Sequence, residues 1–140
     1  MRALLGLDVG EKRIGVALSD PEGILAVSLT VIAIKSEDEA LKRIIALAQE
    51  HEVERIVVGL PISLDGSMGP QAQKVQSFAE ALKDRTELPV VTWDERFSTF
   101  DAERVLTEAG LKREKRKKHL DSVAAAYILQ GYLDRERPAK

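Results

Sequence analysis

Four carboxylates stand where an α/β domain would place chemistry. Asp8 interrupts an otherwise apolar strand-like segment, Asp94 and Glu95 directly follow another, and Asp121 lies on or beside the apolar stripe of the last predicted helix. Three carboxylates brought together repel one another unless cations neutralise them, and all-oxygen ligands suit Mg²⁺ or Mn²⁺. Two such ions about 3.5–4 Å apart would clamp the attacking and leaving oxygens of a phosphodiester. The pattern therefore predicts metal-dependent phosphodiester hydrolysis.

Each acid also has a structural explanation when it is taken alone. Asp8 can cap the turn that follows it, Glu95 can be a solvated loop residue, and Asp121 can be a first-turn acid favoured by the helix dipole. Only the conjunction of the three favours a site. Trp93 and Phe97 flank the acids, where a core role is the default and stacking on a nucleobase is the alternative.

The composition bounds the class of protein. The chain has 140 residues, of which 44% are hydrophobic and 31% charged, as is ordinary for one globular domain. We expect a single domain over residues 1–134 and a polar tail over 135–140. Cysteine is absent, which excludes disulfides, thiolate metal sites and a cysteine nucleophile. The N-terminus resembles neither a signal peptide nor a membrane span, so a cytoplasmic protein without membrane association is expected.

The net charge of −2 hides an asymmetry between one segment and the rest of the chain. Residues 112–118 carry six basic groups and one acid, whereas the remaining residues carry 15 basic and 22 acidic groups. The chain as a whole is therefore not a general polyanion-coating protein, although this one segment can grip phosphates. The alternative is a solvated loop.

Hydrophobic periodicity predicts the element order βββαβαβαα. Strands are predicted at 3–9, 13–19, 24–34, 54–60 and 89–93, and helices after an N-cap at Ser36, around 72–82, from Ser98 or Thr99 to Gly110, and over 119–133. The leading hairpins imply antiparallel pairing, and the strand–helix–strand crossovers imply parallel pairing. The expected fold is an α/β domain with a five-stranded mixed sheet and helices on both faces, which is the layout of ribonuclease H-like domains.

Four sequence blocks in order resemble the YqgF family, whose members are described as Holliday junction resolvases or as pre-16S rRNA processing nucleases. The resemblance runs from Leu5 to Leu133. The blocks are residues 6–10 (GLDVG) with 13–15 (RIG), 58–61 (VGLP) with 65–66 (DG) and Gly69, 94–99 (DERFST), and 121–125 (DSVAA) through 128–130 (ILQ). Any one block is weak evidence, but four at these spacings are specific.

The resemblance implies a ribonuclease H-like fold in which Asp8, Glu95 and Asp121 are the catalytic, metal-binding acids. Two Mg²⁺ or Mn²⁺ ions would be held with substrate bound. Arg13 and Arg96 would lie near the scissile phosphate. The basic segment would position the nucleic-acid backbone without reading its sequence, through Lys112, Arg113, Lys115, Arg116, Lys117 and Lys118.

The function expected from this resemblance is processing of the pre-16S rRNA 5′ end in ribosome biogenesis, by endonucleolytic cleavage of structured RNA, with ribosomal particles as partners. Branched DNA is the alternative substrate, but RuvC-type resolvases carry an acid at the end of the fourth strand, where this chain has Leu60-Pro61. A non-catalytic nucleic-acid-binding or transcription-associated factor is a second alternative. A phosphotransferase of the actin-like ATPase superfamily is a third, although those enzymes need two such domains.

Overall fold

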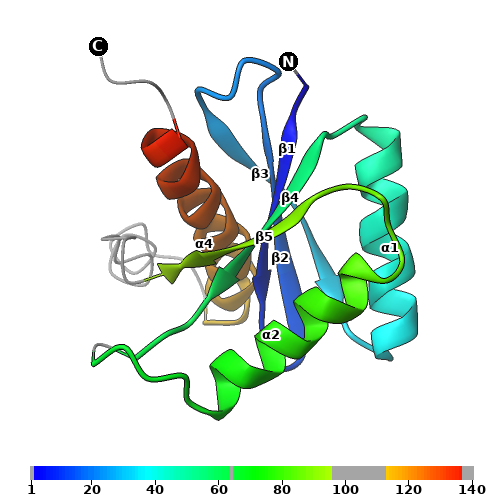
Figure 1. The fold of residues 1–140 in the computed structure, drawn as a ribbon. Coiled ribbons are helices and arrows are strands. Elements are labelled where there is room, and N and C mark those ends of the chain that lie inside the picture. The colour runs from blue at the N-terminus through cyan, green and yellow to red at the C-terminus, as the bar shows by residue number, and fades with distance from the viewer. Residues whose placement is uncertain (1, 64, 96–112, 137–140) are drawn as a thin grey trace.

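A computed structural model describes residues 2–63, 65–95 and 113–136. The described elements form one five-stranded sheet flanked by helices (Figure 1). In chain order they are β1 (Leu4–Val9), β2 (Arg13–Ser19), β3 (Ala26–Ala33), α1 (Glu37–Glu50), β4 (Arg55–Leu60), α2 (Pro70–Lys83), β5 (Val90–Asp94) and α4 (Arg113–Glu136). The expected third helix, with its cap at Ser98 or Thr99, lies outside the described residues.

The strand order β3-β2-β1-β4-β5 confirms the predicted mixed sheet. The leading strands pair antiparallel, and β4 lies parallel between β1 and β5. Leu7 of β1 lies beside Val58 of β4, which lies beside Thr92 of β5. The carboxyl ends of β1, β4 and β5 therefore meet at one edge of the sheet, here called the carboxyl edge.

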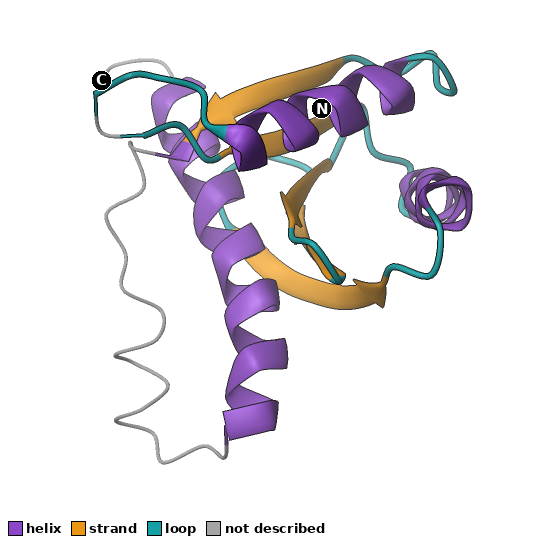
Figure 2. Cartoon of the chain, turned by 90° about the horizontal axis from the view of Figure 1, so that it is seen from below, coloured by secondary structure: helices purple, strands orange, loops and turns teal. Residues whose placement is uncertain are grey.

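Helices cover both faces of the sheet, as predicted. Helices α1 and α2 lie on one face and α4 on the other (Figures 1 and 2). Leu5 and Leu7 belong to the core on the α1 and α2 side, whereas Leu4 belongs to the core beneath α4. Because side chains alternate along a strand, the even-numbered positions of β1 face α4.

Helix α1 begins as its sequence predicts. The Ser36 Oγ accepts a hydrogen bond from the backbone N–H of Glu39 at 3.1 Å, and three acids occupy the first turn, where the helix dipole favours them.

We expect Ser36→Ala to destabilise the protein by about 1 kcal/mol, because one backbone N–H at the start of α1 loses its acceptor. Chemical denaturation measures this loss. Ser36→Asp, which preserves an acceptor, is the control and should stay near wild type. Equal losses in both variants would contradict a capping role.

Several boundaries differ from prediction by one or two residues, among them the following three. β3 begins at Ala26 rather than residue 24, because the Asp20 carboxylate accepts hydrogen bonds from the N–H groups of Ile24 and Leu25 at 2.7 and 3.0 Å and holds both in the turn. These bonds lower the pKa of Asp20. Asp94 is the last residue of β5 rather than the first residue after it. Helix α2 begins at Pro70, whose fixed φ suits a first helical position.

The largest difference concerns the basic segment. Residues 113–118 form the first turns of α4, not a loop before it. Lys, Arg and Glu are good helix formers, and neither Gly nor Pro interrupts residues 113–130, so the helix extends through the charges. At its other end α4 reaches Glu136, so residues 135 and 136 of the expected tail are helical. No helix in the described ranges has the length and apolar character needed to cross a membrane.

Candidate active site at the carboxyl edge

Asp8 lies near the end of β1, half-buried, on the face that α4 covers. It pairs with Gly15 of β2, and Gly6, two residues earlier, lies directly against Leu129 of α4. Strand alternation therefore directs position 8 to the α4 side of the carboxyl edge. The apolar residues before Asp8 are part of the core, so Asp8 lies where the core meets the carboxyl edge.

Glu95 follows β5 directly and is half-buried. Burial first, and then the negative charges of Asp8 and Asp94, together raise the pKa of Glu95 to about 7. Asp8 and Glu95 therefore lie at the same edge of the sheet, at the carboxyl ends of β1 and β5, with β4 between these two strands. Their strands are separated in sequence by two helices.

The third predicted acid, Asp121, lies in α4, and the contacts of that helix fix its direction. Tyr132 of α4 contacts Arg55 at the start of β4, whereas Ile128 lies against Gly59 near the end of β4. The chain of α4 therefore approaches the carboxyl edge toward its own N-terminus. Asp121 lies seven residues before Ile128, about 10 Å along the helix axis. Its side chain is outside the described part of the structure, so its meeting with the other two acids stays a prediction.

Two glycines allow α4 to lie this close to the sheet. A Cβ on Gly6 would lie 2.7 Å from the Leu129 Cβ, and one on Gly59 would lie 2.6 Å from the Ile128 Cδ1. Both distances are shorter than real side-chain contacts allow. Sequence reasoning used these glycines only as parts of motifs and missed their role. The signal was present, since a glycine inside a strand often marks the close approach of another element.

Of the residues predicted to contact phosphate, the one whose side chain is described lies at the carboxyl edge. Arg13 is the first residue of β2, half-buried, and alternates with Ile14 of the opposite core, so it lies on the α4 side near Asp8. Arg96 and Lys112 lie outside the described residues. The other predicted contacts lie in the first turns of α4, and their side chains are not described; they are Arg113, Lys115, Arg116, Lys117 and Lys118.

Among the described residues of the carboxyl edge, Asp8, Asp94 and Glu95 offer oxygen ligands to a metal ion. Within the described ranges no three acids, histidines or cysteines form a group ready to hold a metal ion. Asp8 and Glu95 would supply two ligands, and a third would come from Asp121 or from the substrate. Carboxylates with phosphate oxygens and water fit Mg²⁺ or Mn²⁺, and a divalent cation would relieve the repulsion that Glu95 experiences.

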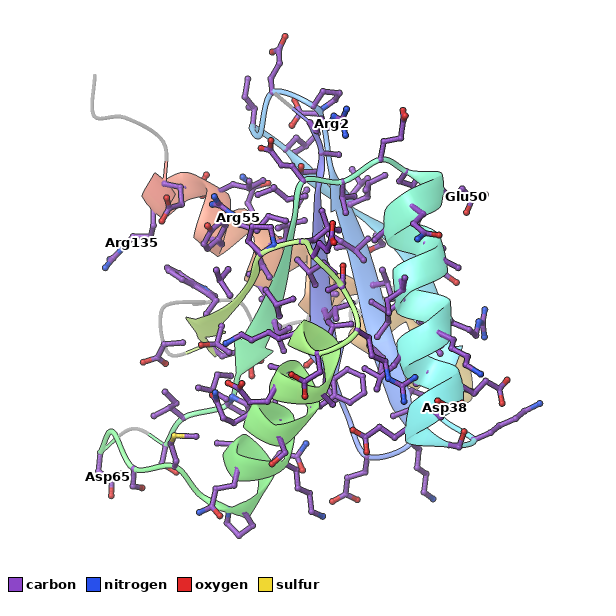
Figure 3. The ribbon with its side chains drawn as sticks, turned by 45° about the vertical axis from the view of Figure 1, so that its right-hand side comes forward. Arg2, Asp38, Glu50, Arg55, Asp65 and Arg135 are labelled. Carbon is purple, nitrogen blue, oxygen red and sulfur yellow. The ribbon has the colours of Figure 1, made fainter. Side chains whose placement is uncertain are left out.

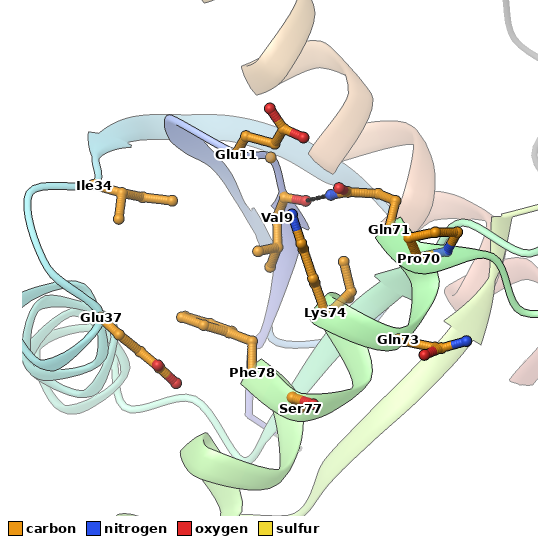
Figure 4. A pocket seen from close by; sticks show the side chains of 12 residues that line it. Val9, Glu11, Ile34, Glu37, Pro70, Gln71, Gln73, Lys74, Ser77 and Phe78 are labelled. Carbon is orange, nitrogen blue, oxygen red and sulfur yellow. Dashed lines mark hydrogen bonds between the residues drawn. The ribbon is translucent and has the colours of Figure 1, made fainter.

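A groove of about 740 Å³ lies on the opposite face, between the β1–β2 turn and the first turns of α1 and α2 (Figure 4). Val9 and Phe78 line it, and the Gln71 Nε2 donates a hydrogen bond to the Val9 carbonyl at 3.4 Å. Because Asp8 faces the α4 side, this groove is separate from the acids.

Comparison with known proteins gives consistent matches over nearly the whole chain. The family model described as "RuvX: Holliday junction resolvase" matches residues 2–135. Proteins named "Putative pre-16S rRNA nuclease" from Clostridium kluyveri and Clostridium acetobutylicum are 49% and 50% identical to this chain. Each match covers 94% of this chain, and the two matches cover 96% and 97% of those proteins, respectively.

Solved structures share the fold at low sequence identity. RuvC of T. thermophilus in complex with Holliday junction substrate has a TM-score of 0.62 at 15% identity, over 96% of each chain. The yeast mitochondrial Holliday junction resolvase Ydc2 has a TM-score of 0.58 at 13% identity, over 93% of this chain and 77% of that one. These similarities confirm the predicted ribonuclease H-like fold.

Proposed function

Because this chain belongs to the RuvX family, we propose that it is a divalent-metal-dependent endonuclease that trims the 5′ end of the 16S rRNA precursor. The observation that supports the proposal is that Asp8 and Glu95 lie at the same edge of the sheet, where the negative charge of Asp8 raises the pKa of Glu95. A protein that only bound nucleic acid would gain nothing from two acids held together beside a polyanion. The curated relatives, half identical over nearly their full length, are named for pre-16S rRNA.

The roles of the residues follow from their positions. Asp8, Glu95 and Asp121 would hold Mg²⁺ or Mn²⁺, which activates water and stabilises charge on a phosphodiester when bound. Arg13 would contact the scissile phosphate from the end of β2, and Arg96 would do so from the segment after Glu95. The basic first turns of α4 would hold the backbone of the strand, which fixes register without reading sequence.

Resolution of Holliday junctions is the second candidate, and the family description and the structural neighbours favour it. The end of β4 argues for RNA instead. Leu60 closes that strand with 7% of its surface exposed and Pro61 follows it, where the resemblance to RuvC-type resolvases would place an acid. We further propose a cytoplasmic location and contact with ribosomal particles, as pre-16S rRNA processing requires.

The test is cleavage of a labelled 5′-extended 16S rRNA precursor and of a four-way DNA junction, each with EDTA, Mg²⁺ or Mn²⁺. We expect metal-dependent cutting of the RNA and a loss of at least about 10³-fold in Asp8→Asn, because an interaction worth several kcal/mol at the transition state is removed. Glu22→Gln removes an exposed acid from the β2–β3 turn at the opposite edge and serves as the control.

Preferred cutting of the junction would assign the resolvase function. Absence of metal-dependent cutting of either substrate by folded protein, with pre-ribosomal particles also supplied, would contradict a nuclease and favour a binding factor.

A further inference from the structure

Two arginines and two aromatic side chains form a continuous cluster between β5 and the end of α4. The Trp93 and Tyr132 rings pack edge to face, with centroids 5.9 Å apart and planes at 87°. The Arg135 guanidinium carbon lies 5.9 Å from the Trp93 ring centroid, and Arg55 Nη1 donates a hydrogen bond to the Tyr132 hydroxyl at 2.6 Å. These four residues are here called the Trp93 platform.

The platform shares its side of the sheet with the candidate site. Trp93 pairs with Gly59 of β4 and packs into the core beneath α4, so it faces the same side as Asp8. It precedes Glu95 by two residues, which span about 6–7 Å of extended chain. Stacked nucleotides rise about 3.4 Å each, so a base at Trp93 would lie roughly two nucleotides from a phosphate at Glu95.

The two arginines of the platform lie at different depths. Arg135 is exposed and extends away from the fold, while Arg55 lies deeper on the same side (Figure 3). Arg55 forms no ion pair within the described ranges. The neighbouring Asp134 accepts a hydrogen bond from the Gln130 amide, which also donates to the Ile24 carbonyl before β3. The Arg135 guanidinium lies over Trp93, and therefore on the β5 side of α4.

Such a surface fits an unpaired nucleotide. Single-stranded bases stack on aromatic rings and on guanidinium planes, and arginine also attracts the adjacent phosphates. Tyr132, buried and held by Arg55, fixes the Trp93 ring from the side, and Trp93 supports Arg135 from beneath. Holding the side chains in place in this way lowers the entropy lost when a base stacks on them.

We propose that the Trp93 platform binds an unpaired base of the substrate strand, stacked on Arg135 over Trp93, and so places the neighbouring backbone at Asp8 and Glu95. This inference rests on the proposed nuclease function. It assigns to the end of α4 a binding role separate from that of the basic residues at its beginning.

Direct binding tests the platform without cleavage. Trp93 is the single tryptophan of the chain, so tryptophan emission reports on this site alone. Protein in EDTA would be titrated with 12-mers of uridylate and thymidylate, and with an abasic deoxyribose-phosphate 12-mer of the same charge. We expect Trp93 emission to change with the base-containing oligomers, and the abasic oligomer to bind about tenfold more weakly, because stacking of one base is lost. The uridylate and thymidylate arms separate RNA from DNA as the source of the strand.

Two variants locate the binding. Arg135→Gln should bind the base-containing oligomers several-fold more weakly and reduce the slope of log affinity against log salt by about 0.7, as the loss of one phosphate contact predicts. Trp93→Phe should keep most of the affinity, whereas Trp93→Leu should bind the base-containing and abasic oligomers equally. Arg43→Gln, an exposed charge change on α1 across the sheet, is the control.

Arg135→Gln is a surface change and should fold normally, so the test does not depend on Trp93→Leu folding. The inference would be overturned if Arg135→Gln left the affinity for the oligomers and the salt slope unchanged. It would also be overturned if Trp93 emission did not change at saturating oligomer. Cleavage by wild type together with that result would leave the nuclease function standing. A response of Trp93 without cleavage of any substrate would leave the platform standing and remove the nuclease.

Discussion

Replacing Glu95 with glutamine is expected to abolish cleavage and, at the same time, to stabilise the metal-free protein above pH 7. The loss of cleavage, at least about 10³-fold, follows from removing a charged ligand beside Asp8. The gain in stability follows from the surroundings of the carboxylate. Burial and the charges of Asp8 and Asp94 raise the pKa of Glu95 to about 7 from an ordinary value of 4.5. A function that needs the charged form thus competes with folding.

The direction of the pH dependence follows from proton binding. Between about pH 4.5 and 7 the folded protein keeps a proton on Glu95 that the unfolded chain releases, so the free energy of unfolding falls as the pH rises through this range. The pKa rise corresponds to at most about 3 kcal/mol, and about 1–2 kcal/mol is expected because Glu95 is only half-buried. Thermal unfolding in EDTA should show Glu95→Gln melting about 3–8 °C above wild type at pH 8, and equal to it near pH 4.5.

Adding a metal ion tests the same explanation by comparing the Tm of wild type and Glu95→Gln with and without the ion. Mg²⁺ or Mn²⁺ at pH 8 should raise the Tm of wild type more than that of Glu95→Gln, because the cation stabilises the charged carboxylate. Glu22→Gln, at the opposite edge, should follow wild type with and without metal. If Glu95→Gln were less stable than wild type at pH 8 in EDTA, Glu95 would be a structural acid held by favourable partners, and its assignment as a ligand would lose its physical basis.

Most of the sheet could be predicted from the sequence, because each strand carries its own signal. The predicted bounds of the second strand, 13–19, are those of β2, and Pro61 marks the end of β4 as predicted. The start of β3 was missed, because the Asp20 carboxylate binds two N–H groups that the apolar pattern assigned to the strand. Such a side-chain bond is a tertiary detail that hydrophobic periodicity does not contain.

The start of α4 was missed for a different reason. Charge density at residues 112–118 favours a segment outside the helix, although the same residue types are good helix formers. For the site, the sequence places acids at strand ends, and the structure has Asp8 and Glu95 at the same edge of the sheet, where the charge of Asp8 raises the pKa of Glu95. The distance between α4 and the sheet could not be predicted, because it depends on which residue faces each glycine, and register between a helix and a sheet is not visible in one sequence.

That distance is the basis of the second large effect. Gly6→Ala is expected to destabilise the protein by about 1–3 kcal/mol and to reduce cleavage by about 10²-fold. The new Cβ would lie 2.7 Å from the Leu129 Cβ, an atom fixed to the backbone of α4, so the helix itself must move. Because α4 also carries Asp121, its displacement moves one predicted ligand away from the other two. Denaturation and cleavage of the same preparations measure the two losses.

Gly59 and Gly69 provide graded controls. At Gly59 the nearest atom to a new Cβ is the Ile128 Cδ1, the flexible end of a side chain, so Gly59→Ala should cost less than Gly6→Ala. At Gly69, where a Cβ meets nothing within 4 Å, alanine should leave cleavage unchanged. Equal losses at the three glycines would contradict the fit of α4 as the cause, because a Cβ at Gly69 has no neighbour to displace.

A double-mutant cycle separates a moved helix from a crowded side chain. Ile128→Val deletes the Cδ1 that opposes Gly59, so it should recover part of the stability and cleavage lost in Gly59→Ala, although alone it costs about 0.5–1.5 kcal/mol. Leu129→Ala retains the Cβ that opposes Gly6 and should recover nothing lost in Gly6→Ala. Recovery at Gly59 without recovery at Gly6 would locate the constraint in the backbone of α4. Recovery of cleavage in Gly6→Ala by Leu129→Ala would contradict it, because the helix could then accept a Cβ at Gly6 without displacing Asp121.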